Sequence, residues 1–273
     1  MARPPRADIA PPELPPRVRW LNSEPGSMPE MTASGPVLVH FFDFAQLNSV
    51  RSLPYVLEWH RRYAEHGLTV LGIHSPRFSF TKTEDALEAG IERLGIPYPV
   101  AQDSSYAIWH DYGVKGWPSL FLWNRSRALA WFHFGEGEYR ATEEAIQAEL
   151  READALVDLP RPMEPLRPSD APGAGVARPT DELFPGGGPG EPWRPEGPGD
   201  ALEVPYAGGG AFAAATGDGS LNVRVDGGPE RAVEIRGPGL YELTEHRGHE
   251  AHRLRITSSG AELYSVGFPA QVP

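Results

Sequence analysis

Hydrophobic runs and helical patterns alternate along the first half of the chain. The run VLVHFF (residues 37–42) is almost wholly apolar, which is typical of a strand covered on both faces, and LTVLGIHS (68–75) repeats this pattern. Between them, RSLPYVLEWHRRYAEHG (51–67) places apolar residues at helical spacing and ends at a glycine. TKTEDALEAGIERLG (81–95) predicts a second helix, which Thr83 could cap. This order predicts two parallel strands joined by a right-handed crossover.

Two more apolar runs, SLFLWN (119–124) and ALAWFHFG (128–135), flank a short turn and predict an antiparallel hairpin. ATEEAIQAELREADAL (141–156) predicts a last helix. Beyond residue 200, short segments such as LNVRV and HRLRIT alternate apolar and polar residues between glycine-rich turns, which is typical of a small sandwich. The predicted fold class is an α/β domain followed by a separate, small all-β, jelly-roll-like sandwich.

The same patterns divide the chain into four predicted parts. Residues 1–34 are rich in proline and polar groups and predict an extended arm, in which Trp20-Leu21 is the obvious anchor. Residues 35–159 form the predicted α/β domain. Residues 160–200 are so rich in proline and glycine that they predict a stiff, extended linker, which could still lie against a domain through Leu183, Phe184 or Trp193. Residues 201–273 form the predicted sandwich.

Charge and composition narrow the classes of partner and of chemistry. A formal charge of −12 over 273 residues, without a basic stripe, argues against binding to nucleic acid phosphates. The chain has no cysteine, which excludes disulfides, thiolate nucleophiles and cysteine-ligated metals. No apolar run reaches the roughly 18 residues of a membrane helix, and the N-terminal residues lack an apolar signal core. We therefore expect a cytoplasmic protein with neither a nucleic acid nor a membrane as partner.

One short motif carries a resemblance to a known family. The stretch Gln46-Leu47-Asn48-Ser49 follows the first apolar run at the expected start of a helix, and a Trp-Pro pair precedes the hairpin. This arrangement resembles the thioredoxin-like fold, in particular domains related to peroxiredoxins and to DipZ-type proteins, over about Trp20 to Leu150. In that family a C-x-x-C pair occupies this place, so the resemblance implies that Gln46 and Ser49 replace both redox cysteines. It also implies that His40 stands where the family has a buried acid.

Other parts of the resemblance concern the surroundings of the motif. Gly116-Trp117-Pro118 matches the loop whose proline is cis in this fold and which faces the motif. The segments after residue 200 resemble the β-sandwich that follows the thioredoxin-like domain in DipZ-type proteins, a domain often likened to carbohydrate-binding modules. The resemblance thus implies a thioredoxin-like scaffold that has lost its thiol chemistry.

Three functions remain open at this point. The first is a redox-inactive binding or scaffold protein, which would use the groove between the Gln46–Ser49 turn and the Trp117-Pro118 loop, with Asp43 beside it. The second is the oxidoreductase or peroxidase that the family implies, whose reactions need a thiolate that this chain lacks. The third is a structural role in an assembly, which predicts an exposed apolar patch or an oligomer. We predict no catalytic residue and no cofactor; an extended peptide and, for the sandwich, a carbohydrate are the expected partners.

Single residues near the motif have both a functional and a structural interpretation. Ser49 with His40 as its base would be a hydrolase pair, but a buried strand favours a neutral core histidine paired to backbone or to a side chain. Asp43 could face the groove as a base, although a solvated loop acid that caps the next turn is the more common case. Of the four tryptophans of this domain after residue 100, Trp117 is expected to be the most exposed.

The second half offers two further candidate sites. His246, His249 and His252 follow one another at intervals of three residues, but alternation along a strand would scatter their imidazoles, so we predict no metal site. An aromatic platform for sugars is the other candidate, although in a small sandwich such residues more often form the core; its members would be Tyr206, Tyr241, Tyr264 and Phe268.

Overall fold

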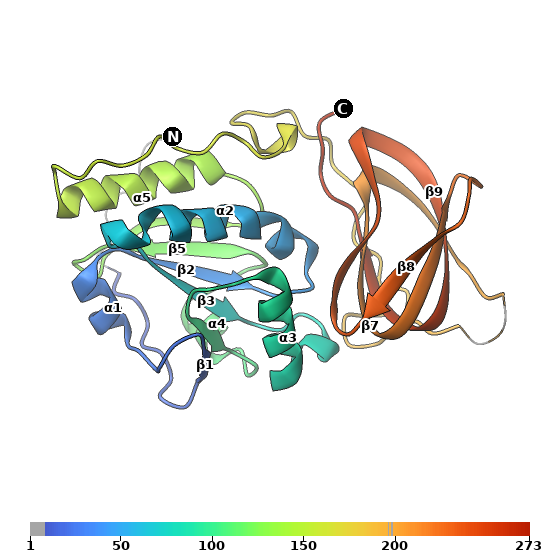
Figure 1. The fold of residues 1–273 in the computed structure, drawn as a ribbon, viewed down its shortest axis with the longest axis horizontal. Coiled ribbons are helices and arrows are strands. Elements are labelled where there is room, and N and C mark those ends of the chain that lie inside the picture. The colour runs from blue at the N-terminus through green and yellow to red at the C-terminus, as the bar shows by residue number, and fades with distance from the viewer. Residues whose placement is uncertain (1–8, 196, 198) are drawn as a thin grey trace. The chain divides into compact units, whose positions relative to one another are not determined.

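A computed structural model describes residues 9–195, 197 and 199–273 (Figure 1). Contacts divide the chain into two compact units. The first contains the described residues up to Asp43, together with Asn48–Pro76 and Gly95–Leu166. The second contains Phe44–Leu47, Arg77–Leu94 and Arg167–Pro273.

The first unit is built on a six-stranded sheet with the order β1-β4-β3-β2-β5-β6. Its strands are β1 (Arg19–Leu21), β2 (Val37–Phe42), β3 (Thr69–His74), β4 (Val100–Gln102), β5 (Ser119–Trp123) and β6 (Leu129–Phe134). β2 and β3 are parallel, as are β3 and β4, whereas β5 and β6 form an antiparallel hairpin beside β2. The predicted parallel pair and the predicted hairpin are confirmed, and the fold is thioredoxin-like.

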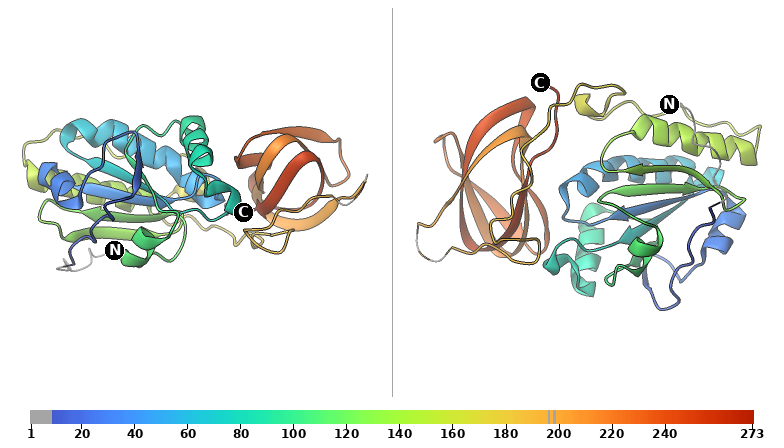
Figure 2. Two further views of the ribbon diagram at one scale, coloured as in Figure 1. Left: turned by 90° about the horizontal axis from the view of Figure 1, so that it is seen from below. Right: turned by 180° about the vertical axis from the view of Figure 1, so that it is seen from behind.

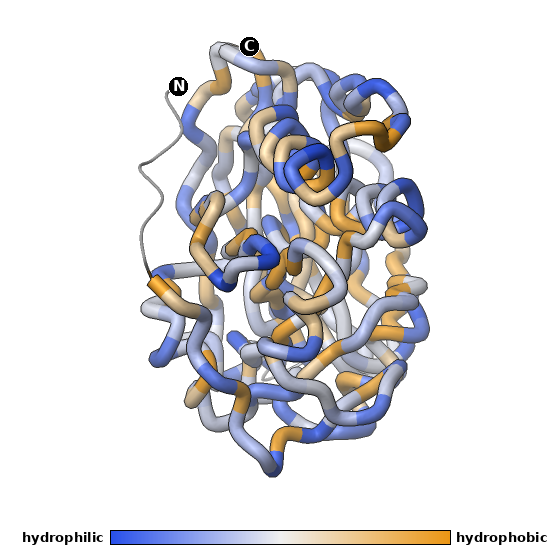
Figure 3. Tube along the Cα trace, turned by 90° about the vertical axis from the view of Figure 1, so that its left-hand side faces the viewer, coloured by the Kyte–Doolittle hydropathy of each residue, from blue (hydrophilic) through white to orange (hydrophobic). Residues whose placement is uncertain are grey.

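Helices cover both faces of this sheet. The helices of the chain are α1 (Met28–Ser34), α2 (Leu47–Tyr63), α3 (Glu84–Leu94), α4 (Ala107–Asp111) and α5 (Tyr139–Ala153), with short 3-10 turns at Ala64–His66, Ser79–Thr81 and Pro168–Asp170. Figure 1 shows α2 and α5 side by side over one face. Met28 of α1 and Ile108 of α4 pack with Val39 and Phe41 in the core of the other face. Figure 3 shows hydrophilic and hydrophobic positions interleaved along the chain. This is expected where each helix buries one side and exposes the other.

The helices at residues 51–67, 81–95 and 141–156 are confirmed as α2, α3 and α5. Thr83 caps α3, because its Oγ1 accepts a hydrogen bond from the Ala86 N–H at 3.3 Å. Within the described residues, no helix is both long and apolar enough to cross a membrane.

The segment before residue 35, which the sequence predicts as an extended arm, contains a strand and a helix. β1 pairs with β4 in an antiparallel register, with Trp20 opposite Ala101. Ser27 and Glu30 form a capping box at the start of α1. The arm prediction is therefore wrong for these residues, because a three-residue strand has no pattern of its own and is defined by its pairing partner.

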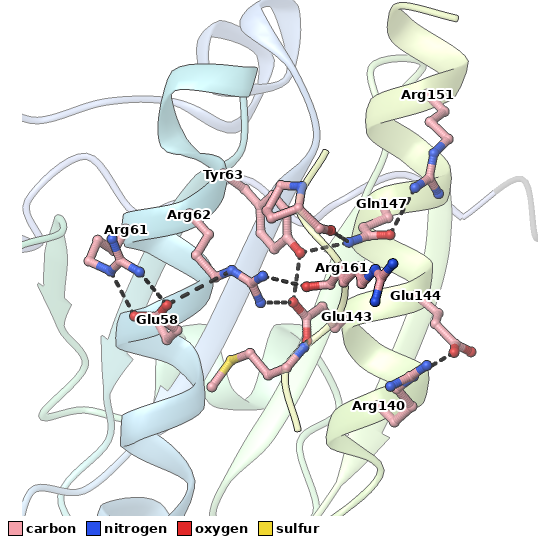
Figure 4. A network of polar contacts seen from close by, with 12 residues as sticks. Glu58, Arg61, Arg62, Tyr63, Arg140, Glu143, Glu144, Gln147, Arg151 and Arg161 are labelled. Carbon is pink, nitrogen blue, oxygen red and sulfur yellow. Dashed lines mark hydrogen bonds and ion pairs between the residues drawn. The ribbon is translucent and has the colours of Figure 1, made fainter. Parts of the chain in front are cut away.

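A buried carboxylate joins α2, α5 and the chain that follows them (Figure 4). Glu143 is 1% exposed and accepts hydrogen bonds from Arg62 Nη1 at 2.7 Å, from Tyr63 Oη at 2.6 Å and from the Met163 N–H at 2.8 Å. Burial and the bond to Glu143 raise the pKa of Tyr63 to about 12. The start of the proline-rich segment is thus bound to the first unit through Met163.

The all-β part of the second unit is a separate antiparallel sheet with the order β8-β7-β9. Its strands are β7 (Leu202–Val225), β8 (Arg231–Arg236) and β9 (Gly239–Gly267). β7 and β9 are long and bent, and Phe212 of β7 lies opposite both Glu242 and Gly267 of β9. The strands therefore curl around one apolar core (Figure 2).

The proline- and glycine-rich segment lies along β9. Leu183 exchanges two backbone hydrogen bonds of 2.9 Å with Val266, and Trp193 makes a bridge with Leu263. The side chains of Leu183 and Trp193 pack against the core of the all-β part. Composition correctly indicates that this segment cannot build a core, but its backbone and a few apolar side chains still bind to one.

Candidate functional site

The former redox turn links the end of β2 to the start of α2. The Asp43 N–H donates a hydrogen bond of 3.3 Å to Ser49 Oγ, and both side chains are buried, with exposures of 0% and 2%. Gln46 and Leu47 are also buried, at 7% and 6%, whereas Asn48 is half-buried. The prediction of a solvated Asp43 is therefore wrong, because its side chain is completely buried.

His40 lies in the middle of β2 and is 0% exposed. Its ring stacks on Phe42, with 5.2 Å between centroids, and Phe42 in turn makes an edge contact with His74 at 5.5 Å. Among the described residues, neither nitrogen of His40 has a hydrogen-bond partner. Burial lowers the pKa of both His40 and His74 to about 3, so both imidazoles are neutral at pH 7.

This environment decides between the interpretations of His40. The neutral core histidine is confirmed, but its expected pairing to backbone or to a side chain is wrong within the part of the chain that the structure describes. Strand pairing uses the neighbouring backbone groups, and the ring faces apolar side chains. Since His40 makes no hydrogen bond to Ser49, it does not serve as a general base for Ser49.

The Trp117–Pro118 loop is held by side-chain contacts on one side of the sheet. The peptide bond between these residues is cis. Trp117 Nε1 donates a hydrogen bond of 2.8 Å to the Ser75 carbonyl. The centroid of the Trp117 ring lies 4.3 Å from that of Trp109. Ser119 Oγ donates to the Gly116 carbonyl at 2.6 Å. Trp117 is thus half-buried and anchored.

A buried acid that sequence reasoning missed supports this loop. Asp103 is 2% exposed and accepts hydrogen bonds from Ser75 Oγ at 3.0 Å and from the Ile108 and Trp109 N–H groups at 3.1 and 2.9 Å. Burial raises its pKa, and these hydrogen bonds oppose that shift. An Asp shortly before a helical segment was the available signal, since such residues cap helices. Asp103 therefore positions α4 and Ser75, which in turn hold Trp117.

Taken together, these contacts hold the backbone of the predicted site in place. The polar groups around the former motif are buried and are used to fix the loop and the first turn of α2. Asn48 and Trp117 are the half-buried members of the predicted site, so they offer its accessible surface. No thiol is present in the chain to react there.

The aromatic platform predicted as one alternative in the second half is not formed. Tyr206, Tyr264 and Phe268 are buried, with exposures of 4%, 6% and 5%, and Tyr241 is half-buried. Tyr206 and Phe268 belong to the core cluster. The core interpretation of these two residues is confirmed, and sugar binding would need other side chains.

Two histidines of the triplet lie close together, contrary to expectation. His246 and His252 come together with Glu250, each offering one atom such that all three atoms lie within 4.8 Å of one another. His249 does not belong to the group. The expectation that alternation along a strand separates the imidazoles is wrong for His246 and His252, because β9 does not keep one continuous register with β7 between Glu245 and Glu250.

An open cleft of about 500 Å³ lies beside this group. It is lined by Thr180, Pro205, Tyr206, Ala207, Asp226, Ala251, His252 and Arg253. Because Asp226 and His252 line this cleft, their side chains are accessible to a ligand from solvent.

No protein-family model matches the chain. It is 33% identical over 196 residues to protein DipZ of Mycobacterium bovis and of Mycobacterium tuberculosis, which covers 71% of this chain and 26% of those proteins. It is 30% identical over 132 residues to NHL repeat-containing protein 2 of Gallus gallus, covering 48% of this chain and 18% of that protein. The chain thus spans about a quarter of the length of the DipZ proteins it matches.

Among solved structures, a thioredoxin-like superfamily protein is 22% identical, covers 55% of this chain and 99% of its own, and has a TM-score of 0.48. A putative thiol:disulfide interchange protein DsbE from Chlorobium tepidum is 21% identical, covers 54% of this chain and 98% of its own, and has a TM-score of 0.45.

Proposed function

We propose that this cysteine-free, thioredoxin-like relative of the DipZ proteins is a binding protein without thiol chemistry. It would hold an extended peptide or protein segment at the Trp117–Pro118 loop. In thioredoxins this loop pairs its backbone with an extended peptide, and such pairing needs no cysteine.

The observation that carries the proposal is the anchoring of the loop. The bond from Trp117 Nε1 to the Ser75 carbonyl and the bond from Ser119 Oγ to the Gly116 carbonyl fix the loop from both sides. A loop fixed before binding loses little conformational entropy when a peptide pairs with it. The anchored loop therefore supports the proposal of peptide binding by a chain whose sequence contains no thiol.

Calorimetric titration of the full chain with a panel of extended peptides of varied sequence tests this function. Trp117→Phe keeps an aromatic ring beside Trp109 but removes the indole N–H, so we expect it to weaken peptide binding roughly tenfold, or about 1.4 kcal/mol. The matched control is Trp131→Phe, which removes a half-buried indole that donates to Thr142 Oγ1 at 3.2 Å. Binding that both variants weaken equally, or no binding by any peptide, would contradict the proposal.

The oxidoreductase alternative has a separate test. Thiol-disulfide exchange and thiol peroxidase chemistry both proceed through a thiolate. We expect the purified chain to give no disulfide reduction and no peroxide consumption above the rate without protein. Turnover by the purified chain would show that some other group does this chemistry.

A role in an assembly is the second candidate, because β6 carries an apolar pair at the outer strand of the sheet. Phe132 and Phe134 are 43% and 39% exposed, and their rings lie 5.5 Å apart. Light scattering of the full chain and of a Phe132→Ser, Phe134→Ser double variant distinguishes the assembly role from the peptide-binding role. An oligomer that the double variant dissociates would favour the assembly, whereas a monomer in both favours the peptide site.

A further inference from the structure

The group formed by His246, Glu250 and His252 depends on a bulge in β9. Gly208 of β7 lies opposite Glu250, whereas Gly210 lies opposite Glu245, so a step of two residues on β7 faces a step of five on β9. A bulge of this kind re-aims side chains near it. Here it brings the ring of His246 to 4.2 Å from that of His252, between ring centroids.

Hydrogen bonds fix the orientation of His252. Its Nδ1 lies 2.6 Å from Asp226 Oδ2, and the other oxygen of Asp226 accepts the Arg253 N–H at 2.8 Å. Because Nδ1–H donates to this carboxylate, Nε2 of the neutral ring carries a lone pair. Nε2 lies 3.3 Å from Glu250 Oε2, so two electron-rich atoms face each other. Only a cation between them, either a proton or a metal ion, makes this arrangement favourable.

We propose that His246, Glu250 and His252 bind a divalent transition-metal ion of the zinc type. Two imidazoles and one carboxylate are a ligand set that Zn²⁺ takes in proteins. With ligand distances of about 2.0–2.1 Å, two ligands of a tetrahedral zinc ion lie about 3.3 Å apart. The separation of 3.3 Å between His252 Nε2 and Glu250 Oε2 matches this value.

The surroundings of the group match the second shell of a metal site. A ligating histidine commonly donates its other N–H to a carboxylate or another acceptor, which fixes its ring. Asp226 has this role for His252. Tyr206 Oη lies 2.7 Å from His246 Nε2, and the Tyr206 ring stacks on Phe268, with 4.9 Å between centroids. The Tyr206 side chain is thus itself held in place.

The open cleft gives the ion access to solvent. His252 and Asp226 both line it, so water or an oxygen atom of a ligand could complete the coordination from that side. Mg²⁺ and Ca²⁺ prefer oxygen ligands and should not compete for two imidazoles.

Calorimetry with ZnCl₂ on the full, untagged chain at pH 7.5 tests the proposal. We expect one Zn²⁺ per chain, and neither Mg²⁺ nor Ca²⁺ should displace it. His252→Gln should weaken binding at least 100-fold, and Asp226→Asn, which leaves the ligands in place, should weaken it by 10- to 100-fold. The matched control is His249→Gln, which removes an imidazole from the same bulge but outside the group and should leave the affinity unchanged.

Several experimental results would overturn the proposed zinc site. No heat with Zn²⁺ at millimolar concentration, or equal losses in His249→Gln and His252→Gln, would overturn the site. X-ray absorption at the zinc edge gives a readout that does not depend on any variant, with two imidazole nitrogens and oxygen as the expected ligands. A zinc ion with a different ligand set would also overturn the assignment.

Discussion

His40 and His252 are the same residue type in two opposite environments. His40 is completely buried in a parallel strand beside Phe42, and burial lowers its pKa to about 3. His252 lies at the surface of the all-β part between Asp226 and Glu250, and the hydrogen bond that its ring donates to Asp226 is the largest cause of its raised pKa. The first imidazole is part of a core, whereas the second can exchange a proton or bind a cation near neutral pH.

This difference explains why the family's motif is a poor guide to chemistry in this chain. At the former redox turn the polar side chains are buried and support the backbone, as the pair Asp43 and Ser49 illustrates. The group in β9 instead combines two imidazoles with carboxylates beside an open cleft. Residue environment, rather than the position of a motif, shows where proton or metal chemistry is feasible.

The largest expected effect concerns a carboxylate in the interior of the first unit. Glu143→Ala should lower the free energy of unfolding by about 3–5 kcal/mol, because it removes the buried carboxylate to which Tyr63 and Arg62, itself 14% exposed, donate hydrogen bonds. Urea unfolding followed by tryptophan fluorescence measures this, since all of the 7 tryptophans except Trp193 lie in the first unit.

The exposed pair between Arg140 and Glu144 on the same helix is the control. Its side chains are 43% and 58% exposed, so Glu144→Ala should change the stability by at most about 0.5 kcal/mol. If Glu143→Ala and Glu144→Ala lower the free energy of unfolding by the same amount, burial does not set the strength of these two ion pairs.

The next effect tests the environment of His40 through pH. A histidine with a folded pKa of about 3 and an unfolded pKa of about 6.5 binds a proton only in the unfolded state between these values, so stability is lost as pH falls through this range. For His40 the loss between pH 7 and pH 5 is about 2 kcal/mol. His40→Leu should remove this part of the acid sensitivity, as measured by urea unfolding at both pH values.

His66→Gln, which removes an imidazole at an exposed position, is the matched control variant. A His40→Leu variant that loses as much stability in acid as the parent would mean that His40 is protonated in the folded protein.

The smallest effect concerns the pair between His252 and Asp226. The raised folded pKa of His252 means that its contribution to stability is fully present below its unfolded pKa and is lost as pH rises through the folded value. Asp226→Asn should lower the pKa of His252, because it removes the largest cause of the shift. An NMR titration of the imidazole signals measures this, and a pKa that does not change would remove Asp226 as a partner.

Much of the first unit follows from sequence patterns, whereas contacts between distant residues do not. The β2–α2–β3 order and the β5–β6 hairpin were predictable because each element has its own periodicity. β1 was missed because it has only three residues and depends on pairing with β4. The burial of His40 follows from the apolar run around it, but the anchoring of Trp117 by Ser75 joins residues far apart in the chain.

The group in β9 was missed for a related reason. The bulge depends on the register between β7 and β9, which no local pattern of β9 reveals. Gly210 was the available signal: its φ is +145°, and a Cβ at this position would clash with the Thr244 carbonyl oxygen. Glycine in a strand often marks a bulge or a close approach of the backbone.

A single NMR titration tests the central comparison most directly. Long-range ¹H–¹⁵N spectra distinguish neutral from charged imidazoles, and His40→Leu and His252→Gln assign the two sets of signals. The account predicts that His40 remains neutral from pH 8 down to about pH 4, as its pKa of about 3 requires, while His252 titrates above the ordinary histidine value. Titration of His40 near pH 6.5, or of both residues together, would contradict it.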